Sequence, residues 1–323
     1  YGAVPVPLDP RLWALVRLAR LRPDDLSVPM AERRERAARL SRLGAGLLIA
    51  TEPRPAAIGH VSVPVAGGRI RVRLYRPHGT GPFPLYVFIH GGGFCQGTLD
   101  ERDQRCRAVS AGARCVVASV DYRLAPENQY PTAPEDCYAA LEWLVRHADR
   151  LEVDPRRVAI GGESAGANLA AVVCLMGRDR GGPPLVHQWL DVPTTDATCS
   201  QSGFRDVPDG YLLDRAVIDD FFAHYLPSPE RALEPYCSPL LAADLSGLPP
   251  AWIMTAELDK LRGDGEAYAA ALRAAGVAVT HVRLAGHIHP SFAFTRLLPS
   301  ARAYQVRAIA ALAAAFAAAE PRG

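Results

Sequence analysis

The sequence predicts an α/β protein whose central sheet is mostly parallel and carries helices on both faces. Short runs rich in branched and aromatic residues alternate with helical stretches along most of the 323 residues, and Gly or Pro bounds many of these runs. Strands that alternate with helices favour parallel pairing, because each helix returns the chain to the same edge of the sheet. The predicted strands lie at 70–75, 85–90, 115–120, 158–161, 185–190, 252–255 and 277–284. The predicted helices lie at 101–112, 133–148, 164–177, 214–225, 263–275 and 300–319.

Two segments depart from this alternation. Residues 1–50 have the spacing of amphipathic helices, and the second of these is arginine-rich and expected over 30–43, ending at Gly44. Residues 194–235 contain turn residues followed by a helical run, which marks an insertion above the sheet. No linker is long enough to separate independent domains, so we expect a single main domain over 51–323.

Charge and hydropathy exclude several function classes. Lys and Arg together number 36 and Asp and Glu 34, and the net charge of +2 gives no strong field to hold nucleic acid or an anionic membrane. No apolar stretch reaches membrane-spanning length, so stable membrane anchoring is not expected.

Seven cysteines are spread along the chain without a CxxC pair, so neither a zinc site nor a redox dithiol is expected. Several of them, such as Cys115 and Cys174, lie in apolar runs, where a reduced thiol behaves as a small hydrophobic group. This usage predicts a reducing cytoplasm. The sequence predicts neither a metal nor a cofactor.

Residues 162–166 read Gly-Glu-Ser-Ala-Gly, a GxSxG motif that follows a predicted strand and opens an apolar helix. A serine on so sharp a turn has strained backbone angles, and side chains two residues to either side would collide. The helix dipole favours negative charge at the same point. We therefore predict that Ser164 is a nucleophile.

A second glycine-rich segment, His90-Gly91-Gly92-Gly93-Phe94, directly follows an apolar strand. Consecutive glycines let backbone N–H groups converge on one point, which is what a developing oxyanion requires. The N–H group of Ala165, next to the nucleophile, is a further donor. Neither GxGxxG nor a phosphate-loop Lys-Ser/Thr pair accompanies this loop, so a nucleotide site is not favoured. His90 is expected to anchor the loop rather than to carry a proton.

A nucleophilic serine needs a histidine base and an acid that orients it, in the chain order Ser, Asp or Glu, His for this kind of fold. The loops after the last two predicted strands supply candidates in that order. Glu257 and Asp259 follow the first of these strands, with Asp264 a later alternative. His287 and His289 follow the second, and because they are two residues apart only one of them can reach the serine.

Four stretches together form a specific pattern: HGGGF at 90–94, DYRLAPEN with YPTAPED at 121–136, GESAGANLA at 162–170 and LDKLRGDGEAY at 258–268. In these stretches the sequence resembles the hormone-sensitive-lipase-like family of α/β-hydrolase esterases, bacterial carboxylesterases with HGGG and GxSxG motifs. The resemblance runs from about residue 70 to the C-terminus. It implies an α/β-hydrolase catalytic domain at 51–323 with a helical cap built from residues 1–50 and an insertion at about 194–235.

The resemblance also implies roles for individual residues. It assigns the acid to Asp259 and the base to His289, with His287 in reserve. The oxyanion donors that it implies are the backbone N–H groups of Gly92, Gly93 and Ala165. Phe94 is expected to contact the substrate. His287, which replaces an apolar family position, is expected either to line the site and contact the substrate or to cap a loop.

The sequence departs from the family pattern at two places. Family members usually read Asp-Pro-Leu-Arg-Asp where residues 259–263 read Asp-Lys-Leu-Arg-Gly, and the glycine after the family histidine is replaced by Pro290 and Ser291. In the second matching stretch, Asp121 and Arg123 are expected to pair beneath the oxyanion loop, with Asp136 joining them.

These observations predict a serine hydrolase that cleaves carboxylic esters with short to medium acyl chains through an acyl-enzyme. The expected partner is a small-molecule ester. The oligomeric state is left open between a monomer and a homodimer of two copies of the chain. An alternative is a specialised biosynthetic hydrolase that acts on an amide, an acetyl group or a lactone, or that catalyses elimination. A non-catalytic binding module is disfavoured because every member of the triad is present.

Overall fold

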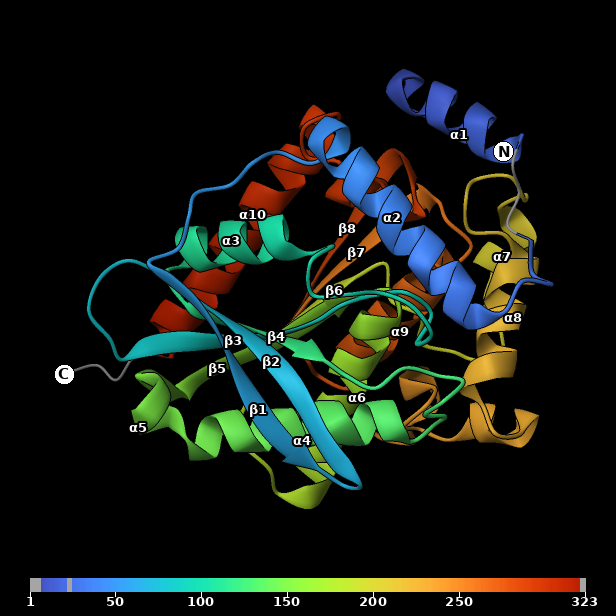
Figure 1. Cartoon of the computed structure of the whole chain (residues 1–323). Coiled ribbons are helices and arrows are strands. Elements are labelled where there is room, and N and C mark those ends of the chain that lie inside the picture. Colours follow the sequence, from blue (N-terminus) through green and yellow to red (C-terminus); the bar gives the residue numbers. More distant parts are fainter. Residues whose placement is uncertain (1–6, 22–24, 320–323) are drawn as a thin grey trace.

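A computed structural model describes residues 7–21 and 25–319, so residues 1–6, 22–24 and 320–323 of the predicted segments lie outside the described residues. The strands in the described part are β1 Ala57–Val65, β2 Gly68–Arg76, β3 Phe83–Ile89, β4 Val116–Asp121, β5 Val153–Glu163, β6 His187–Asp191, β7 Ala251–Leu258 and β8 Val279–Ile288. They form one eight-stranded sheet in the order β1-β2-β4-β3-β5-β6-β7-β8 (Figure 1). Pairing is parallel from β4 to β8 and antiparallel at β1–β2 and β2–β4, which confirms the predicted mostly parallel sheet.

Helices cover both faces of this sheet, as predicted. The helical segments in the described part are η1 Pro10–Leu12, α1 Trp13–Arg20, α2 Met30–Leu48, α3 Asp103–Ala113, α4 Thr132–Arg146, α5 Ala148–Leu151, α6 Ala165–Arg180, α7 Gly203–Asp206, α8 Arg215–Tyr225, η2 Pro229–Leu233, η3 Pro239–Leu241, α9 Arg262–Ala274, η4 His289–Ala293 and α10 Pro299–Ala318. The helices α3 and α10 pack on one face, where Ile309, Leu312 and Phe316 are buried. The helices α4, α6 and α9 pack on the other face (Figure 1).

The centre of the sheet is buried on both faces. Every residue of β3 is buried, and its sequence FPLYVFI is a continuous apolar run rather than an alternating one. This is the pattern of a parallel strand covered by helices on both sides. The adjacent helix α6 is buried from Ala165 to Gly177, since its many small residues let it lie close against the sheet. The helix that follows the GxSxG turn and the strand that precedes the triple glycine are therefore among the most buried elements of the fold.

One strand was not predicted, and one helix ends later than predicted. The strand β1 was not expected, because it carries a proline and a glycine and buries only Val63, as an edge strand can. The helix α2 does not end at Gly44 but continues to Leu48. Its last turn is held by tertiary contacts, since the Leu48 carbonyl accepts hydrogen bonds from the backbone N–H groups of Arg296 and Leu297. These contacts override the low helix propensity of glycine.

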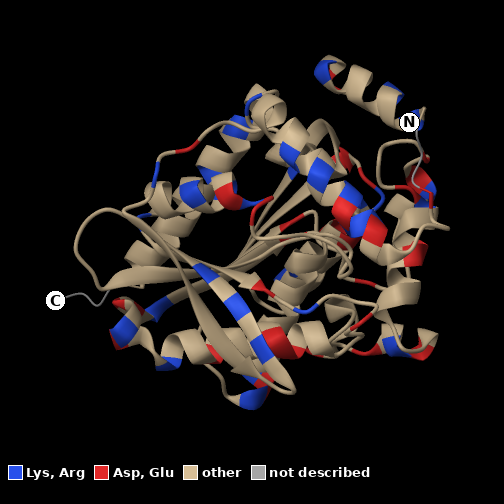
Figure 2. Ribbon diagram, viewed as in Figure 1, with Lys and Arg blue, Asp and Glu red and all other residues tan. Residues whose placement is uncertain are grey.

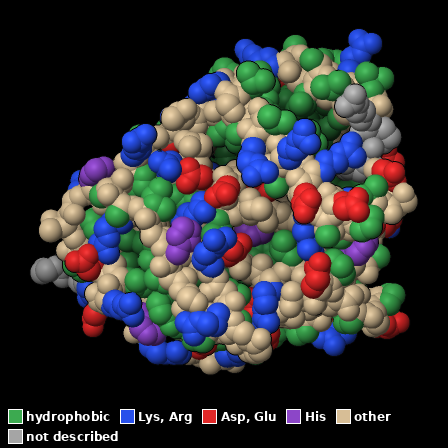
Figure 3. All heavy atoms as spheres, in the orientation of Figure 1, with side chains coloured by type: hydrophobic (Ala, Val, Ile, Leu, Met, Phe, Trp, Pro, Cys, Tyr) green, Lys and Arg blue, Asp and Glu red, His purple; other side chains and the backbone are tan. Residues whose placement is uncertain are grey.

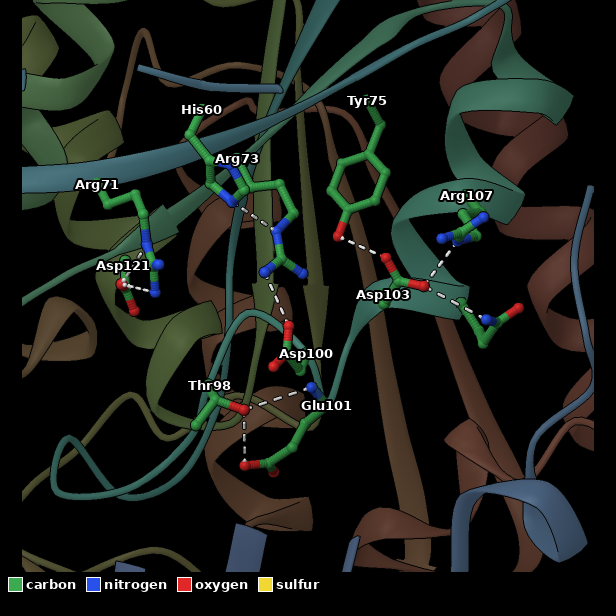
Figure 4. Close-up of polar contacts among 11 residues, drawn as sticks. His60, Arg71, Arg73, Tyr75, Thr98, Asp100, Glu101, Asp103, Arg107 and Asp121 are labelled. Atoms are coloured by element: carbon green, nitrogen blue, oxygen red, sulfur yellow. Dashed lines mark hydrogen bonds and ion pairs between the residues drawn. The ribbon is translucent and has the colours of Figure 1, made fainter. Parts of the chain in front are cut away.

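The predicted pairing of Asp121 with Arg123 is also wrong. Asp121 lies directly opposite Arg71 in the antiparallel β2–β4 ladder, and their side chains form an ion pair at 3.0 Å (Figure 4). Arg123 instead binds the buried carboxylate of Asp136, with Nη2 2.6 Å from Oδ1. Strand register decides this choice, because it places Arg71 beside Asp121 on the same face.

A polar network holds the segment before α3 against the edge of the sheet (Figure 4). Arg73 of β2 forms an ion pair with Asp100 at 2.7 Å, and the hydroxyl of Tyr75 donates to Asp103 at 3.1 Å. Asp103 also pairs with Arg107 one turn further along α3 at 2.6 Å. Arg102 lies between these anchored residues. The network thus fixes the backbone that carries the Arg102 side chain.

In the part of the chain that the structure describes, no helix combines the length and the apolar character that crossing a bilayer requires. This agrees with the absence of a long apolar stretch in the sequence.

His187, at the start of β6, gives a prediction about stability. It is buried, and burial lowers its pKa to about 4, whereas an unfolded histidine titrates near 6.5. Between these two values the unfolded chain binds a proton that the folded chain does not, so stability falls as the pH falls from about 6.5 to about 4 and levels off below. The lost free energy of unfolding is about 3 kcal/mol.

We expect His187→Gln to reduce this pH dependence, measured as the free energy of urea unfolding from pH 7 to pH 4. His78→Gln, at an exposed histidine, is the matched control and should keep the wild-type slope. An unchanged slope in His187→Gln would contradict the assignment.

Candidate active site

Ser164 lies on the turn between β5 and α6 in a strained conformation, with φ 54° and ψ −122°. Its backbone N–H donates to the carbonyl of Asp191 on β6 at 2.8 Å, which holds the turn against the sheet. A Cβ atom at Gly162 would overlap the backbone of Gly166, and one at Gly166 would overlap the carbonyl oxygen of Ile89. Only glycine fits at these two positions, which is the steric reason that the sequence motif indicated.

Ser164, His289 and Asp259 form a chain of hydrogen bonds. His289 Nε2 lies 3.0 Å from Ser164 Oγ, and His289 Nδ1 lies 2.7 Å from Asp259 Oδ2. The other oxygen of the buried Asp259 carboxylate accepts the backbone N–H of Leu261 at 3.0 Å. With the proton on Nδ1, the imidazole donates to Asp259 and accepts from the serine hydroxyl. The three residues follow β5, β7 and β8, whose carboxyl ends meet at one edge of the sheet.

The alternative acids lie elsewhere. Glu257 forms ion pairs with Arg262 at 3.4 Å and with Arg283 at 3.7 Å. Asp264 is buried and accepts the backbone N–H of Thr195 at 2.8 Å, and burial raises its pKa well above the usual value. Among the described residues neither carboxylate bonds to His289.

Of the two roles expected of His287, the structure supports the one in a loop, and the substrate contact must be corrected. This histidine is buried outside the residues that line the cavity, and its Nδ1 and Nε2 lie 2.8 Å from the hydroxyls of Ser291 and Ser300. Burial lowers the pKa of His287, which favours the neutral form of the ring. Ser291 also donates to the carbonyl of Ile288 at 2.8 Å. His287 and Ser291 therefore brace the loop that carries His289, which gives a structural reason for one departure from the family pattern.

Phe94 also lies away from the cavity lining, so its predicted substrate contact must be corrected too. Its ring is buried and stacks on Tyr225 of α8 with the centroids 3.9 Å apart. Its carbonyl accepts the backbone N–H of Ala125 at 3.0 Å. Phe94 thus holds the glycine loop between the sheet and α8. The sequence did not indicate this role, because Tyr225 lies 131 residues further along the chain.

The glycine loop wraps tightly beside the serine. The carbonyl of Gly92 accepts the backbone N–H groups of Cys95 and Gln96 at 3.1 and 2.8 Å. Gly93 has φ 59°, and a Cβ atom there would overlap the ring of Phe221 on α8. Three backbone N–H groups beside the Ser164 hydroxyl have no acceptor among the described residues and are free to bind another group. These are Gly92, Gly93 and Ala165.

His90 supports this loop from below. It is buried, its Nδ1 lies 2.9 Å from the carbonyl of Gly91, and its ring stacks on Tyr122 with the centroids 4.5 Å apart. The hydroxyl of Tyr122 in turn donates to the His90 carbonyl at 3.1 Å. Burial lowers the pKa of His90, which favours the neutral form of the ring. These contacts agree with an anchoring role.

A cavity of about 290 Å³ opens over Ser164. Its base is formed by the glycine loop, the serine and the histidine, and its walls are apolar side chains of α2, of α8 and of the segment around η4. The lining residues are Leu40, Ser41, Gly44, Ala45, Leu48, Ile49, Gly91, Gly92, Gly93, Arg102, Glu163, Ser164, Val192, Leu213, Phe221, His289, Pro290, Phe292, Ala293 and Phe294.

A buried ion pair lies beside the nucleophile and was not predicted. Glu163, the second residue of the GxSxG motif, is buried and bonded to Arg102, with Arg105 4.0 Å away. Burial opposes ionisation of this carboxyl group, but Arg102 and Arg105 lower its pKa below the usual value. The side chains of Glu163 and Arg102 both reach the cavity wall. The acidic residue in the motif indicated a buried partner, but not which of the many arginines would be that partner.

The other departure from the family pattern connects the acid loop to residues of the predicted insertion. The ammonium group of Lys260 is buried, donates to the carbonyl of Val207 at 2.7 Å and pairs with Asp209 at 3.0 Å. A Cβ atom at Gly263 would lie 2.8 Å from the backbone nitrogen of Gly203. Lysine and glycine at these positions therefore let the segment 202–209 pack directly against the acid loop.

No group of three or more His, Cys, Asp or Glu residues that could hold a metal ion occurs within the described ranges. The site consists instead of a serine, a histidine and a carboxylate in series beside free backbone N–H groups. Together with the sheet order, this arrangement defines the class of the protein as an α/β hydrolase.

Comparisons with known proteins place the chain more closely. A family model described as alpha/beta hydrolase fold matches residues 86–293. The chain is 49% identical over 225 residues to the carboxylic ester hydrolase LipN of Mycobacterium tuberculosis, an alignment that covers 68% of this chain and 60% of LipN. It is 45% identical over 247 residues to the carboxylesterase NlhH of the same organism, covering 75% of this chain and 77% of NlhH. The solved structure of a hyperthermophilic esterase from Pyrobaculum calidifontis superposes with a TM-score of 0.91 at 36% identity, covering 97% of this chain and 100% of that one. The chain belongs to the hormone-sensitive-lipase-like family of α/β hydrolases, and its enzyme class is that of the carboxylic ester hydrolases.

The contact between Gly93 and Phe221 gives a testable prediction. We expect Gly93→Ala to lower kcat/KM for p-nitrophenyl acetate, because the new methyl group forces either the loop or the ring of Phe221 to move. In a Phe221→Ala background the same change should cost less, since only the backbone strain of about 1 kcal/mol remains. Equal losses in the two backgrounds would show that the ring does not limit the loop.

Proposed function

We propose that the protein hydrolyses small-molecule carboxylic esters with short to medium acyl chains through an acyl-enzyme on Ser164. One observation carries this proposal: the Ser164 hydroxyl lies 3.0 Å from an imidazole whose other nitrogen lies 2.7 Å from the buried carboxylate of Asp259. The ester hydrolases among the relatives support the reaction class.

In the first half-reaction, Ser164 Oγ attacks the ester carbonyl carbon while its proton passes to His289 Nε2. Asp259 holds the ring through Nδ1 and stabilises the imidazolium that forms. The carbonyl oxygen becomes an oxyanion, which accepts hydrogen bonds from the backbone N–H groups of Gly92, Gly93 and Ala165. In comparable sites each such donor lowers the barrier by roughly 3 kcal/mol.

The tetrahedral intermediate then collapses, and the alcohol departs with the proton that His289 held. In the second half-reaction a water molecule gives a proton to His289 and attacks the acyl carbon. Collapse of this second intermediate releases the carboxylic acid and returns the proton to Ser164 Oγ. The overall reaction consumes one water per ester.

The size and lining of the cavity support short to medium acyl chains. Its volume of about 290 Å³ lies at the lower end of the range of ligand pockets, roughly 300–1,000 Å³. The wall formed by Leu40, Gly44 and Leu48 of α2 is apolar, as an acyl chain requires. Pro290, in place of the family glycine, also faces this space.

We also propose that residues 1–50 and about 194–235 act together as a cap over the catalytic part, 51–323. Cavity-lining residues from both segments support this division, as does the ion pair between Arg33 of α2 and Asp220 of α8 at 2.6 Å. All seven cysteines are free and buried, which supports a reducing cytoplasm as the location. A homodimer remains a prediction.

The roles of the triad residues can be tested by substitution. Ser164→Ala should reduce hydrolysis of p-nitrophenyl butyrate to background, and Asp259→Asn should lower kcat by about 10⁴-fold because the imidazole loses the partner that fixes its tautomer. Glu257→Gln, two residues earlier at the end of β7, is the matched control and should retain activity. Full activity in Ser164→Ala, or equal losses in Asp259→Asn and Glu257→Gln, would exclude this mechanism.

The wall formed by α2 can be tested with two glycines of the same helix. Gly44 lines the cavity, whereas Gly46 does not line it and has open space where a Cβ would be. Gly44→Leu should fill the acyl wall and lower the ratio of kcat/KM for hexanoate to that for acetate esters by about tenfold or more. Gly46→Leu raises helix propensity to the same extent and should leave the ratio unchanged.

The substrate panel should also contain an anilide and a lactone, which represent the alternative chemistries. The proposal expects the esters to react fastest. A preference for the anilide or the lactone would contradict ester hydrolysis as the main activity.

A further inference from the structure

The outer face of α2 exposes a row of leucines. Leu40, Leu43 and Leu47 are 59%, 69% and 76% exposed. Single exposed leucines are common on protein surfaces, whereas a row of them is unusual. Their spacing of three and four residues places them within about 60° around the helix axis. They therefore form one apolar stripe that no described residue covers.

The helix α1 exposes further apolar side chains. Trp13, Leu18 and Leu21 are 53%, 63% and 78% exposed. Both helices rest on the same segment of the chain: residues 294–298 pack against the buried side of α1 and bond to the carbonyl of Leu48 at the end of α2. Figure 3 shows hydrophobic side chains at the molecular surface over α1 and α2. We call these six residues the cap face.

The charges on the half of α2 that carries the stripe are all positive, and the nearest acidic group that interacts with them is the exposed carboxylate of Asp25, which lies near Arg36. From Arg36 to Leu48 the charged residues of α2 are three arginines, Arg36, Arg39 and Arg42, and all three are exposed without an ion-pair partner among the described residues. Figure 2 shows this half of α2 without acidic residues, whereas acidic residues occur at its other end. The whole-chain charge of +2 conceals this local excess of positive charge.

The cap face is continuous with the cavity over Ser164. Leu40 belongs to both, since it lines the cavity and is more than half exposed. Gly44, Ala45 and Leu48 of the same helix line the cavity on the side away from the stripe. A surface that covers the stripe would thus lie at the mouth of the candidate active site.

We infer that the cap face docks reversibly on the surface of an amphiphile assembly with anionic headgroups, a bilayer or a micelle. Exposed leucines and a tryptophan can enter the interfacial layer, while arginines beside them pair with acidic headgroups. Nucleic acid offers no apolar layer for the leucines, and a second copy of this face would bring the arginines of both copies together. The docking is independent of the triad chemistry proposed above and involves no membrane-spanning segment.

Flotation of the whole protein with lipid vesicles tests this inference. Wild type should float with vesicles of phosphatidylcholine mixed with phosphatidylglycerol at low salt, and less with phosphatidylcholine alone or in 1 M NaCl, where the Debye length is about 3 Å. The double variant Leu43→Gln/Leu47→Gln should bind the mixed vesicles at least about tenfold more weakly than wild type. The triple variant Arg36→Gln/Arg39→Gln/Arg42→Gln should lose the preference for phosphatidylglycerol.

Two controls separate docking from folding and from catalysis. Leu233→Gln, at an exposed leucine of η2 outside the cap face, should float like wild type. Ser164→Ala should also float like wild type, whatever its activity. The Leu43→Gln/Leu47→Gln variant should hydrolyse p-nitrophenyl acetate within about twofold of wild type, because neither residue lines the cavity.

Results of two kinds, flotation and sedimentation, could overturn the inference. One is wild type that does not float with any vesicle, or a Leu43→Gln/Leu47→Gln variant that floats as well as wild type. The other is sedimentation velocity in which wild type is a dimer and this variant a monomer while neither binds vesicles, which would assign the leucines to contact between two copies.

Discussion

The site depends on the backbone of Ser164, which is held at φ 54° and ψ −122°. Such a conformation costs on the order of 1–3 kcal/mol and persists only where the surroundings enforce it. Here β6 holds the turn through the carbonyl of Asp191, and the buried helix α6 holds it from the other side. Because Gly162 and Gly166 carry no Cβ, the strand β3 and the start of the glycine loop can lie against this turn. One strained residue thus fixes the distance between the serine hydroxyl and the free backbone N–H groups.

The parallel sheet supplies the rest of the site. The candidate acid and base are 30 residues apart in the sequence. They meet because β7 and β8 are neighbouring strands that end at the same edge of the sheet. Behind the serine, the positive charges of Arg102 and Arg105 face the carboxylates of Glu163 and Asp191. A buried charge that loses its partner destabilises the fold strongly, so each of these side chains holds its partner in place. The floor of the cavity is accordingly rigid, while its upper walls come from helices at the surface.

The fold class, the candidate nucleophile and the glycine loop could be predicted from the sequence because they depend on local patterns, whereas the choice of Asp259 and His289 among the neighbouring acids and histidines came from the family resemblance. The GxSxG turn, the triple glycine and the order of Ser164, Asp259 and His289 each have a local physical cause. The contacts that were mispredicted depend instead on packing between distant segments. Asp121 pairs with Arg71 because of strand register, Phe94 turns toward Tyr225 of α8, and α2 continues past Gly44 because residues 296 and 297 bond to its last turn. Sequence patterns carry little information about such partners, and they also left β1 unrecognised because an edge strand need bury only one face.

Lys260 has a consequence for the modular use of this architecture. Its ammonium group joins the loop of the candidate acid to residues 207 and 209, and the missing side chain at Gly263 admits residue 203. Cap segments vary more readily than sheets, and exchanging them is an obvious way to alter selectivity. In this protein a segment taken from a relative would contact Lys260, whose hydrogen bond and ion pair are made with residues of the original segment. The donor's residues at 260 and 263 would have to be transferred together with the segment, so the unit of exchange is larger than the insertion itself.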